Sequence, residues 1–502
     1  MRMLVKYPLG RRRGVVAILA AVALLGSFLF WQRSSWSEPL VPAHPLPAQQ
    51  TRLWQYLHSQ LEEHAPQAPR PTLISQIGDL RFNAVLDQPR PNMIANAEEL
   101  LEPMQRAHDG FVEAIRRPIN RPYLAGSRGI VTSAGGDYFP TFLVTLRMIR
   151  RTGSTLPVEV FLNRWDEYEP YICEVVLPPL NAQCRVIQEI LSNSGESHRS
   201  ISIEHFQIKS IAMLFSSFET FVWLDADCVP LYDPAILLDS APFTLTGLVA
   251  WPDFWAETVS PLYLNISRQP DLPMTARQAT ESGLLMMSKK RHFLSLLLAV
   301  YYNYYGPDLY YEILSQGGVG AGDKDTFLHA ARALGEQFYT VSERVLGLGH
   351  PAPDGGVLGS AMLHFDPIQD YALTSQGKWR VKDTSVAKPP RPFFVHANNP
   401  KFNAGHELLN GLKGENQRGK PHRLWTASKE ALQLIGFDVE KMVWEETKTV
   451  TCNLEHAFFS WQKKTGLCES VQNRWSAIFE DPTEETPKFT QDPKDKDQAH
   501  ST

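Results

Sequence analysis

The 502-residue chain lacks several features that would point to common classes of protein. Its formal net charge is −5, so no general excess of basic residues favours nucleic acid as its main partner. It contains no Gly-x-Ser-x-Gly, His-Glu-x-x-His or Cys-x-x-Cys sequence, and hydrolase and protease functions lose support accordingly. The glycine-rich stretch at residues 317–320 is not followed by Lys-Ser or Lys-Thr, so it is not a Walker-type phosphate loop.

Cysteine is also scarce, with five residues in the whole chain. Two local pairs, Cys173 with Cys184 and Cys452 with Cys468, are candidates for disulfides, which would leave Cys228 free. Sequence alone does not determine connectivity. This usage agrees with an oxidising compartment, and the spacings do not resemble a zinc site.

The N-terminus carries one long apolar run. Residues 14–31 contain no charge, and as a helix they would span about 27 Å, close to the thickness of a thin bilayer. Arg11, Arg12 and Arg13 precede the run, so the positive-inside rule places residues 1–13 in the cytosol and the rest in a lumen. The alternative is a cleaved signal peptide, which would also direct the chain into the secretory pathway.

Composition divides the remainder into a stem, a folded domain and a tail. Residues 32–117 are predicted to be a stem with packing helices, because residues 34–72 are rich in proline and polar residues and residues 97–117 have helical periodicity. Residues 118–480 are predicted to form the catalytic domain. Residues 481–502 are charged and contain proline, which is typical of a disordered tail.

Short apolar runs alternate with helical segments in the folded domain, which predicts an α/β fold with a mostly parallel sheet. A strand at residues 129–133, a glycine-rich turn, a helix at residues 139–151 and a strand at residues 157–161 have the layout of a nucleotide-binding unit. Gly129 and Thr132 of the first strand are candidates for contact with the nucleotide. Further along we expect helices at residues 208–217 and 291–302, and strands at residues 221–224 and 283–287.

The central motif is a pair of carboxylates, Asp225 and Asp227, that ends the apolar strand at residues 221–224. In an extended chain a spacing of two residues directs both side chains to one face. Ligands of open α/β sheets bind beyond the carboxyl ends of the strands, where these residues fall. Two oxygen ligands suit Mn²⁺ or, as the alternative, Mg²⁺, with a diphosphate completing the coordination.

Other polar residues extend this candidate site. His396 follows a short apolar run at residues 393–395 and is a candidate third metal ligand, although a structural histidine is the alternative. Lys209 and Lys401 are candidates for offsetting phosphate charge. Glu281 and Asp323 are the candidate catalytic carboxylates near the sugar. The alternative for Asp323 is a helix N-cap.

With these residues in view, the chain resembles the fungal Golgi α-mannosyltransferases of glycosyltransferase family 71. The resemblance rests on an ordered set of motifs that covers roughly residues 120–410. It includes Trp-Leu-Asp-Ala-Asp at residues 223–227, Gly-Asp-Lys-Asp-Thr-Phe at 322–327 and His-Ala-Asn-Asn-Pro-Lys at 396–401. The remaining segments are residues 128–136, 146–157, 206–210 and 281–283.

The resemblance implies a GT-A-like nucleotide-sugar-binding fold, a single-pass type II Golgi membrane protein with a lumenal catalytic domain, GDP-mannose as donor and Mn²⁺ as cofactor. It also implies a retaining transfer of mannose to mannan or glycoprotein glycans, with an α-1,2 linkage favoured. Two alternatives stay open, an α-1,3-mannosyltransferase of the same family and a non-catalytic glycan-binding subunit with the same fold.

Overall fold

The computed structural model describes residues 46–192, 203, 206–351, 357–410 and 421–480. The chain divides into two compact units, residues 1–49 and residues 50–502. The predicted cytosolic tail, the anchor at residues 14–31 and the tail at residues 481–502 lie outside the described residues. None of the helices in the described part is both long and apolar enough to cross a membrane.

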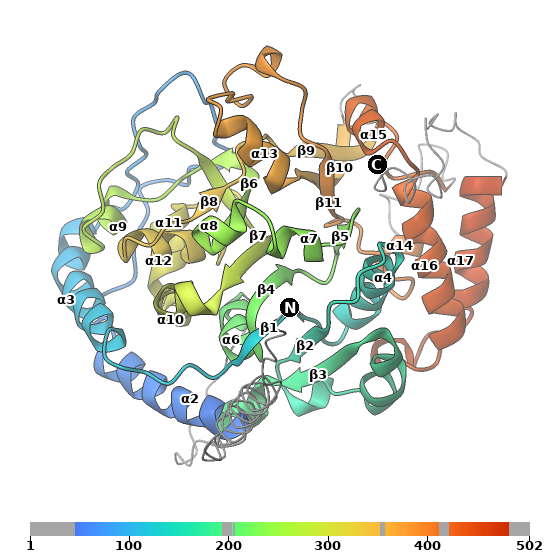
Figure 1. Cartoon of the computed structure of the whole chain (residues 1–502), viewed down its shortest axis with the longest axis horizontal. Helices are drawn as coiled ribbons and strands as arrows, with labels where there is room; N and C mark the ends of the chain where they lie inside the picture. Colours follow the sequence, from blue (N-terminus) through green and yellow to red (C-terminus); the bar gives the residue numbers. More distant parts are fainter. Residues whose placement is uncertain (1–45, 193–202, 204–205, 352–356, 411–420, 481–502) are drawn as a thin grey trace, which may run out of the picture. The chain divides into compact units, whose positions relative to one another are not determined.

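The centre of the second unit is a seven-stranded sheet with the order β3-β2-β1-β4-β7-β6-β8 (Figure 1). Strands β3, β2, β1 and β4 are parallel to one another, β7 pairs antiparallel to both β4 and β6, and β8 is parallel to β6. The prediction of an α/β fold with a mostly parallel sheet is therefore confirmed. The strands are β1 (Leu124–Ser133), β2 (Val158–Leu162), β3 (Ala182–Val186), β4 (Phe218–Leu224), β6 (Leu248–Ala256), β7 (Gln278–Ser288) and β8 (Tyr339–Thr340).

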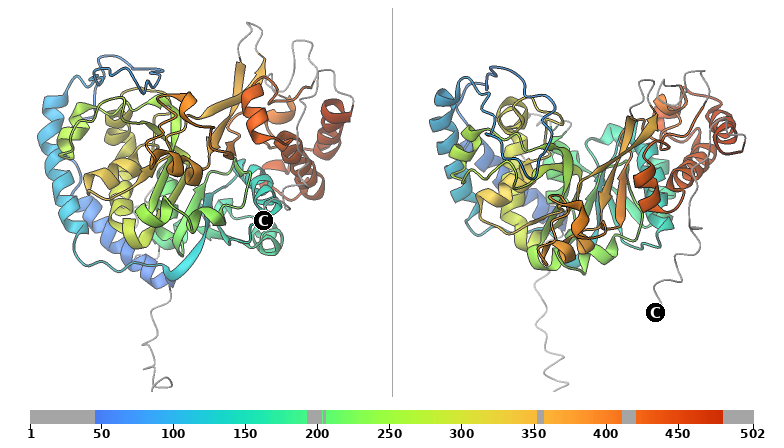
Figure 2. Two further views of the ribbon diagram at one scale, coloured as in Figure 1. Left: turned by 45° about the horizontal axis from the view of Figure 1, so that its top comes forward. Right: turned by 90° about the horizontal axis from the view of Figure 1, so that it is seen from above.

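Both faces are buried at the centre of this sheet, because every residue of β2 and each residue of β4 from Phe221 to Leu224 is buried. On β4, Phe221 and Trp223 point into one core and Val222 and Leu224 into the other. The helices of the two cores lie on opposite sides of the sheet (Figure 2). One side carries α3 (Ala97–Ile115), α6 (Gln207–Phe215), α9 (Pro261–Ile266), α10 (Lys289–Tyr304), α11 (Tyr311–Ser315) and α12 (Thr326–Ala333), and the other α4 (Tyr138–Arg151), α16 (Val439–Leu454) and α17 (Leu467–Trp475).

A second, four-stranded antiparallel sheet has the order β5-β11-β10-β9. Its strands are β5 (Cys228–Pro230), β9 (Leu346–Pro351), β10 (Val357–Phe365) and β11 (Pro392–His396). Strand β5 follows directly after the Asp225–Asp227 turn, and the register of β5 with β11 places Cys228 opposite His396. This sheet, which the sequence did not predict, joins two motifs that are 169 residues apart. The shorter helices are α5 (Ile187–Ser192), α7 (Ala235–Leu238), α8 (Phe243–Thr246), α13 (Pro367–Thr374), α14 (Glu407–Asn410) and α15 (Lys429–Ile435).

The predicted stem at residues 34–72 differs from the structure over its described part. Helix α2 (Leu46–Glu63) packs its residues Trp54, Leu57 and Leu61 into the core, with no exposed surface on any of the three. Their spacing of three and four residues places them on one face of the helix. Residues 50–63 therefore belong to the folded unit as a packing helix. The helix predicted at residues 97–117 is confirmed as α3.

The two disulfides are formed as their local spacing suggested. Cys173 is bonded to Cys184, and Cys452 is bonded to Cys468. Cys228 is free and buried on β5.

Candidate functional site

A cavity of about 840 Å³ lies at the carboxyl ends of β1, β2 and β4. The turn that follows β4 contributes Asp225, Ala226 and Asp227 to its lining, and α6 contributes Lys209. Lys401, from the segment after β11, also lines it. The polar residues of the central motif therefore meet at one open cavity, where ligands of α/β sheets bind.

Asp225 is held by two hydrogen bonds at the end of β4. Its amide donates to the carbonyl of Gly283 on β7, with an N···O distance of 2.8 Å. Its Oδ1 accepts a hydrogen bond from Trp223 Nε1 at 3.0 Å. Its side chain is 24% exposed, so one side of the carboxylate remains available to a ligand.

Lys209 links Asp225 to the residues behind it. Its Nζ donates to Asp225 Oδ2 at 3.0 Å and to Ser282 Oγ at 3.0 Å, and it lies 3.6 Å from Asp323 Oδ2. Burial lowers the pKa of Lys209, but Asp225 and Asp323 raise it more, and the net direction is upward. The lysine is therefore a fixed positive charge at the cavity wall.

Asp227 is the more buried of the two aspartates, with a side chain that is 4% exposed. His396 Nε2 lies 3.2 Å from its Oδ1, and Lys401 forms an ion pair with its Oδ2. Burial would raise the pKa of Asp227, but these two cations lower it well below its usual range. Asp227 is therefore an anion that requires positive partners on both of its oxygens.

His396 completes the group from β11. Burial lowers its pKa, but Asp227, Glu281 and Asp225 outweigh that effect and raise it to about 9. With no metal present, an imidazolium between carboxylates is the form that the local charges favour. A neutral imidazole would be needed for metal binding, so a cation would replace the proton.

One potential ligand atom each from Asp225, Asp227 and His396 lies within 4.8 Å of the others. Two carboxylate oxygens and an imidazole nitrogen suit a divalent first-row metal. Lys209 and Lys401 each pair with one of the two carboxylates, so a bound cation would share these carboxylates with the lysines. The described residues therefore fit a divalent cation, with Asp225, Asp227 and His396 as the residues that would hold it.

Glu281 and Asp323 do not line the cavity but contact residues of this site. Glu281 Oε1 lies 3.7 Å from His396 Nδ1 and accepts from the amide of Gly283 at 2.6 Å. Asp323 accepts from Ser282 Oγ at 3.1 Å, and burial raises its pKa to about 6 against the opposing effect of Lys209. The geometry favours positioning roles for both carboxylates over the catalytic roles that the sequence suggested.

Gly129 and Thr132 do not line the cavity. A Cβ atom at Gly129 would lie 2.4 Å from the ring of Phe218, so this glycine is required for packing inside the sheet. Ser133 and Ala134 line the cavity instead. At the usual rise per residue of a strand, Ser133 lies about 13 Å from Gly129 along β1. The structure therefore places Gly129 and Thr132 outside the lining of this cavity.

The cavity also contains residues that the sequence did not reveal. Asn163 and Glu167 follow β2, and the Asn163 amide donates to Glu167 Oε2 at 2.7 Å. Glu167 lies against Gly135, where a Cβ atom would be 2.5 Å from its carboxylate oxygen. Tyr138 lines the cavity from the first turn of α4. Only the glycine-rich turn at residues 134–136 hinted at this part of the site.

His364 on β10 is a further residue that sequence reasoning missed. Its side chain is buried, and neither ring nitrogen has a hydrogen-bond partner among the described residues. Burial and the neighbouring His396 lower its pKa to about 3. His364 shares a second group of potential ligand atoms with Glu281 and His396. No sequence signal pointed to it, because β10 itself was not predicted.

A protein-family model described as "Mannosyltransferase putative" matches residues 127–278 and 273–366. Similar proteins include two from Candida albicans and one from Saccharomyces cerevisiae. The α-1,2-mannosyltransferase MNN21 of C. albicans is 33% identical over 435 residues, which cover 75% of this chain and 65% of that protein. MNN24 of C. albicans is 37% identical, and the alignment covers 55% of this chain and 46% of that protein. MNN2 of S. cerevisiae is 31% identical, and the alignment covers 67% of this chain and 66% of that protein. Both are also described as α-1,2-mannosyltransferases, and the chain spans less than two thirds of each of these three relatives.

Among solved structures, the galactosyltransferase LgtC in complex with donor and acceptor sugar analogues aligns with a TM-score of 0.28. The identity is 13%, and the alignment covers 43% of this chain and 73% of that one. This likeness is too weak to support an argument about the site.

Proposed function

Because the chain belongs to the mannosyltransferase family whose model matches residues 127–366, we propose that it transfers mannose from GDP-mannose to a glycan. The acceptors in this proposal are mannan or glycoprotein glycans, and the linkage is α-1,2. The linkage is supported by the relatives, which are named α-1,2-mannosyltransferases. The fold in this proposal is GT-A-like, with the nucleotide-sugar at the carboxyl edge of the main sheet.

The observation that carries the proposal is the meeting of Asp225, Asp227 and His396 beside one cavity, with a lysine on each aspartate. In the proposed enzyme these three residues hold Mn²⁺, or Mg²⁺ as the alternative. When bound there, a divalent cation would supply positive charge against the negative charge of the departing nucleoside diphosphate. Lys209 and Lys401, already at the cavity wall, add positive charge where the phosphates would lie.

The transfer in this proposal retains the α configuration, because GDP-mannose and the product are both α-linked. A departing phosphate oxygen can accept the proton of the acceptor hydroxyl on the same face of the sugar. The chain then has to position the donor rather than supply a strong general base. Trp223 fixes Asp225, and Glu281 and Asp323 hold His396 and Lys209 in place.

The cellular setting of the proposal is the Golgi membrane, with a type II anchor at residues 14–31 and the enzymatic unit in the lumen. The apolar run and the arginines before it support this topology. Protease protection of sealed microsomes would test it. A lumenal unit would resist protease until detergent is added.

The activity can be tested with the full-length chain in detergent micelles, with GDP-mannose, mannobiose and Mn²⁺. We expect GDP release and a mannotriose product whose new bond is α-1,2, and both should be lost in EDTA and restored by Mn²⁺. UDP-glucose in place of GDP-mannose is the control for donor choice. An α-1,3 product would correct the linkage. Binding of mannobiose without any GDP release would favour a glycan-binding subunit.

A further inference from the structure

One motif of the sequence has no role in the proposed transfer of mannose. Asn265-Ile266-Ser267 is the single Asn-x-Ser/Thr tripeptide without a central proline in the 502-residue chain. Such a tripeptide accepts an N-linked oligosaccharide when a chain enters the secretory pathway. Because so short a motif also occurs by chance, its use depends on where the folded chain places the asparagine.

Helix α9, which carries the asparagine, turns it outward. Within residues 262–266, Asn265 is exposed and the other four residues are buried. Gln105 Nε2 of the neighbouring helix α3 (Figure 1) donates to the main-chain carbonyl of Asn265 at 3.1 Å. This contact between the helices does not use the side-chain amide. A glycan on Asn265 Nδ2 would therefore extend into solvent without displacing a packed side chain.

The hydroxyl of Ser267, which the motif also requires, is turned inward. Ser267 is 6% exposed, and its Oγ donates to the carbonyl of Tyr263 at 2.8 Å. Gln269 Nε2 donates to Ser267 Oγ at 3.0 Å and to the Tyr263 hydroxyl at 3.1 Å. The Ser267 hydroxyl therefore donates one hydrogen bond and accepts another inside the protein, and an enzyme that must contact it cannot reach it.

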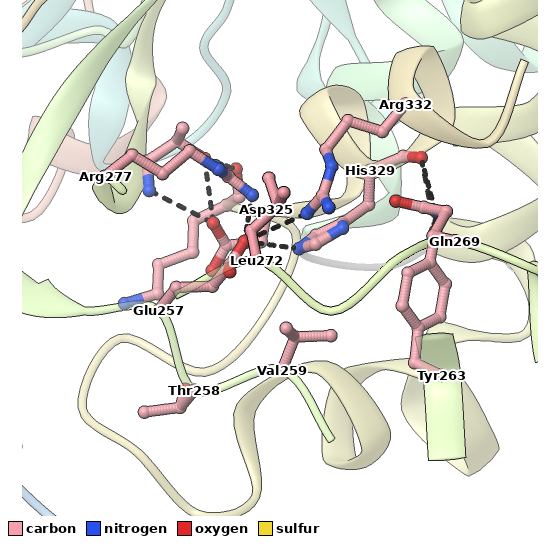
Figure 3. A network of polar contacts seen from close by, with 12 residues as sticks. Glu257, Thr258, Val259, Tyr263, Gln269, Leu272, Arg277, Asp325, His329 and Arg332 are labelled. Carbon is pink, nitrogen blue, oxygen red and sulfur yellow. Dashed lines mark hydrogen bonds and ion pairs between the residues drawn. The ribbon is translucent and has the colours of Figure 1, made fainter. Parts of the chain in front are cut away.

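The segment after α9 is also held against α12. Gln269 Nε2 donates to the carbonyl of His329 at 3.4 Å, and His329 Nε2 lies 3.1 Å from Glu257 Oε1 (Figure 3). The Tyr263 hydroxyl donates to the same His329 carbonyl at 3.2 Å. Exposing Ser267 in the folded protein would therefore disrupt contacts between α9, the segment that follows it and α12.

We propose that Asn265 carries an N-linked oligosaccharide, and that the glycan is added before α9 packs. The proposal rests on the lumenal topology proposed above, and it goes beyond the mannosyltransferase function. An unfolded chain presents both Asn265 and Ser267 to the glycosylating enzyme, whereas the folded chain presents Asn265 and buries the hydroxyl.

The donor in this modification is an oligosaccharide linked to a lipid diphosphate. Asn265 Nδ2 forms a bond to C1 of the first sugar, and the bond between that carbon and the phosphate oxygen breaks. Nδ2 gives up a proton, and the lipid diphosphate leaves with the electron pair of the broken bond.

The modification is tested with the full-length chain expressed in yeast. Peptide N-glycosidase should increase the electrophoretic mobility of the wild type and convert Asn265 to aspartate, which mass spectrometry detects. Asn265→Gln and Ser267→Ala should both migrate like the deglycosylated wild type. Asn453→Gln is the matched control and should keep the shift, because Asn453 is exposed on α16 and is followed by Leu454 and Glu455, which form no such motif.

Protease protection of microsomes from the same cells separates the site from the topology. A chain that is protected but unmodified would overturn the glycan site alone, whereas a chain that is digested and unmodified would overturn the topology as well. A glycan at Asn265 would support the site even if the chain transferred no mannose. Asn265→Gln should keep the wild-type KM and kcat for transfer, because in the described part of the chain no residue of α9 lines the cavity of about 840 Å³.

The order of the two events needs a separate experiment. Full-length protein made in a cell-free extract without microsomes, and folded in detergent with both disulfides formed, is incubated with oligosaccharyltransferase and lipid-linked oligosaccharide. We expect it to be modified at least about tenfold more slowly than a peptide of residues 260–270, since exposing Ser267 requires the folded segment to open. Equal rates for the folded protein and the peptide would overturn the proposed order.

Discussion

Replacing each aspartate of the site by asparagine should separate two roles that the sequence motif does not distinguish. Asp227 is 4% exposed and lies between His396 and Lys401, whereas Asp225 is 24% exposed and pairs with Lys209. Both substitutions remove a candidate metal ligand. We therefore expect both variants to lose transfer by at least about a thousandfold, which corresponds to about 4 kcal/mol in activation free energy.

The two variants should differ in stability when no metal is present. Asp227→Asn leaves a buried histidine and a largely buried lysine without their carboxylate. Removing one partner of a buried ion pair costs about 3–5 kcal/mol, and the partial exposure of Lys401 puts the expected loss near the lower end, about 3 kcal/mol. Asp225→Asn should cost about 1 kcal/mol, because Lys209 keeps Asp323 and Ser282 as partners.

Urea unfolding of the full-length protein in EDTA, monitored by tryptophan fluorescence, measures this difference in the free energy of unfolding. The pKa of Asp227 is lower in the folded than in the unfolded protein, where it is about 3.8. Its stabilisation is then complete above about pH 4 and is lost as the pH falls through the lower folded value. The penalty of Asp227→Asn should accordingly be full at pH 7 and shrink in acid. Equal stability losses in the two variants, or transfer near the wild-type rate in either, would refute the reasoning.

Three further predictions concern other parts of the molecule. Burial raises the pKa of Glu169 to about 7 against a hydrogen bond from the Phe459 amide, so the native state loses stability as the pH rises from about 4.5 to 7. Glu169→Gln should be more stable than wild type by about 1–2 kcal/mol at pH 8 and equal to it at pH 5, as urea unfolding at both values would reveal. Trp54→Ala should lower the free energy of unfolding by about 3–5 kcal/mol in the same assay, because the ring is fully buried. An unchanged urea midpoint would mean that α2 is a stem detached from the core. Glu281→Gln should raise the Mn²⁺ concentration for half-maximal activity about 10–100-fold with little change at saturation, since Glu281 orients His396.

Much of the main sheet could be predicted from local pattern. The strand expected at residues 221–224 is β4 at Phe218–Leu224, and the helix expected at residues 291–302 is α10 at Lys289–Tyr304. Such segments can be recognised in a sequence because a strand buried on both faces and an amphipathic helix have different patterns of apolar residues. The pairing of nearby cysteines was also accessible, since each disulfide closes a short segment.

Part of the candidate site could not be predicted, because it depends on contacts between distant segments. His364 belongs to β10, a strand whose antiparallel partners come from elsewhere in the chain. The burial of Glu281 and Asp323 behind Lys209 and His396 likewise follows from how β7 and the segment before α12 pack. A lone carboxylate in a sequence does not reveal whether it will face a cavity or a neighbouring side chain.

The sequence by itself determined that two carboxylates would end a buried strand, because a spacing of two residues in an extended chain is a local property of the backbone. It likewise indicated strands at residues 129–133, 157–161, 221–224 and 283–287 with helices between them, but not their order in the sheet. Only the tertiary structure decided which cations would face those carboxylates. His396 reaches Asp227 because β11 pairs with β5, and that pairing depends on the free energy of packing the whole second sheet.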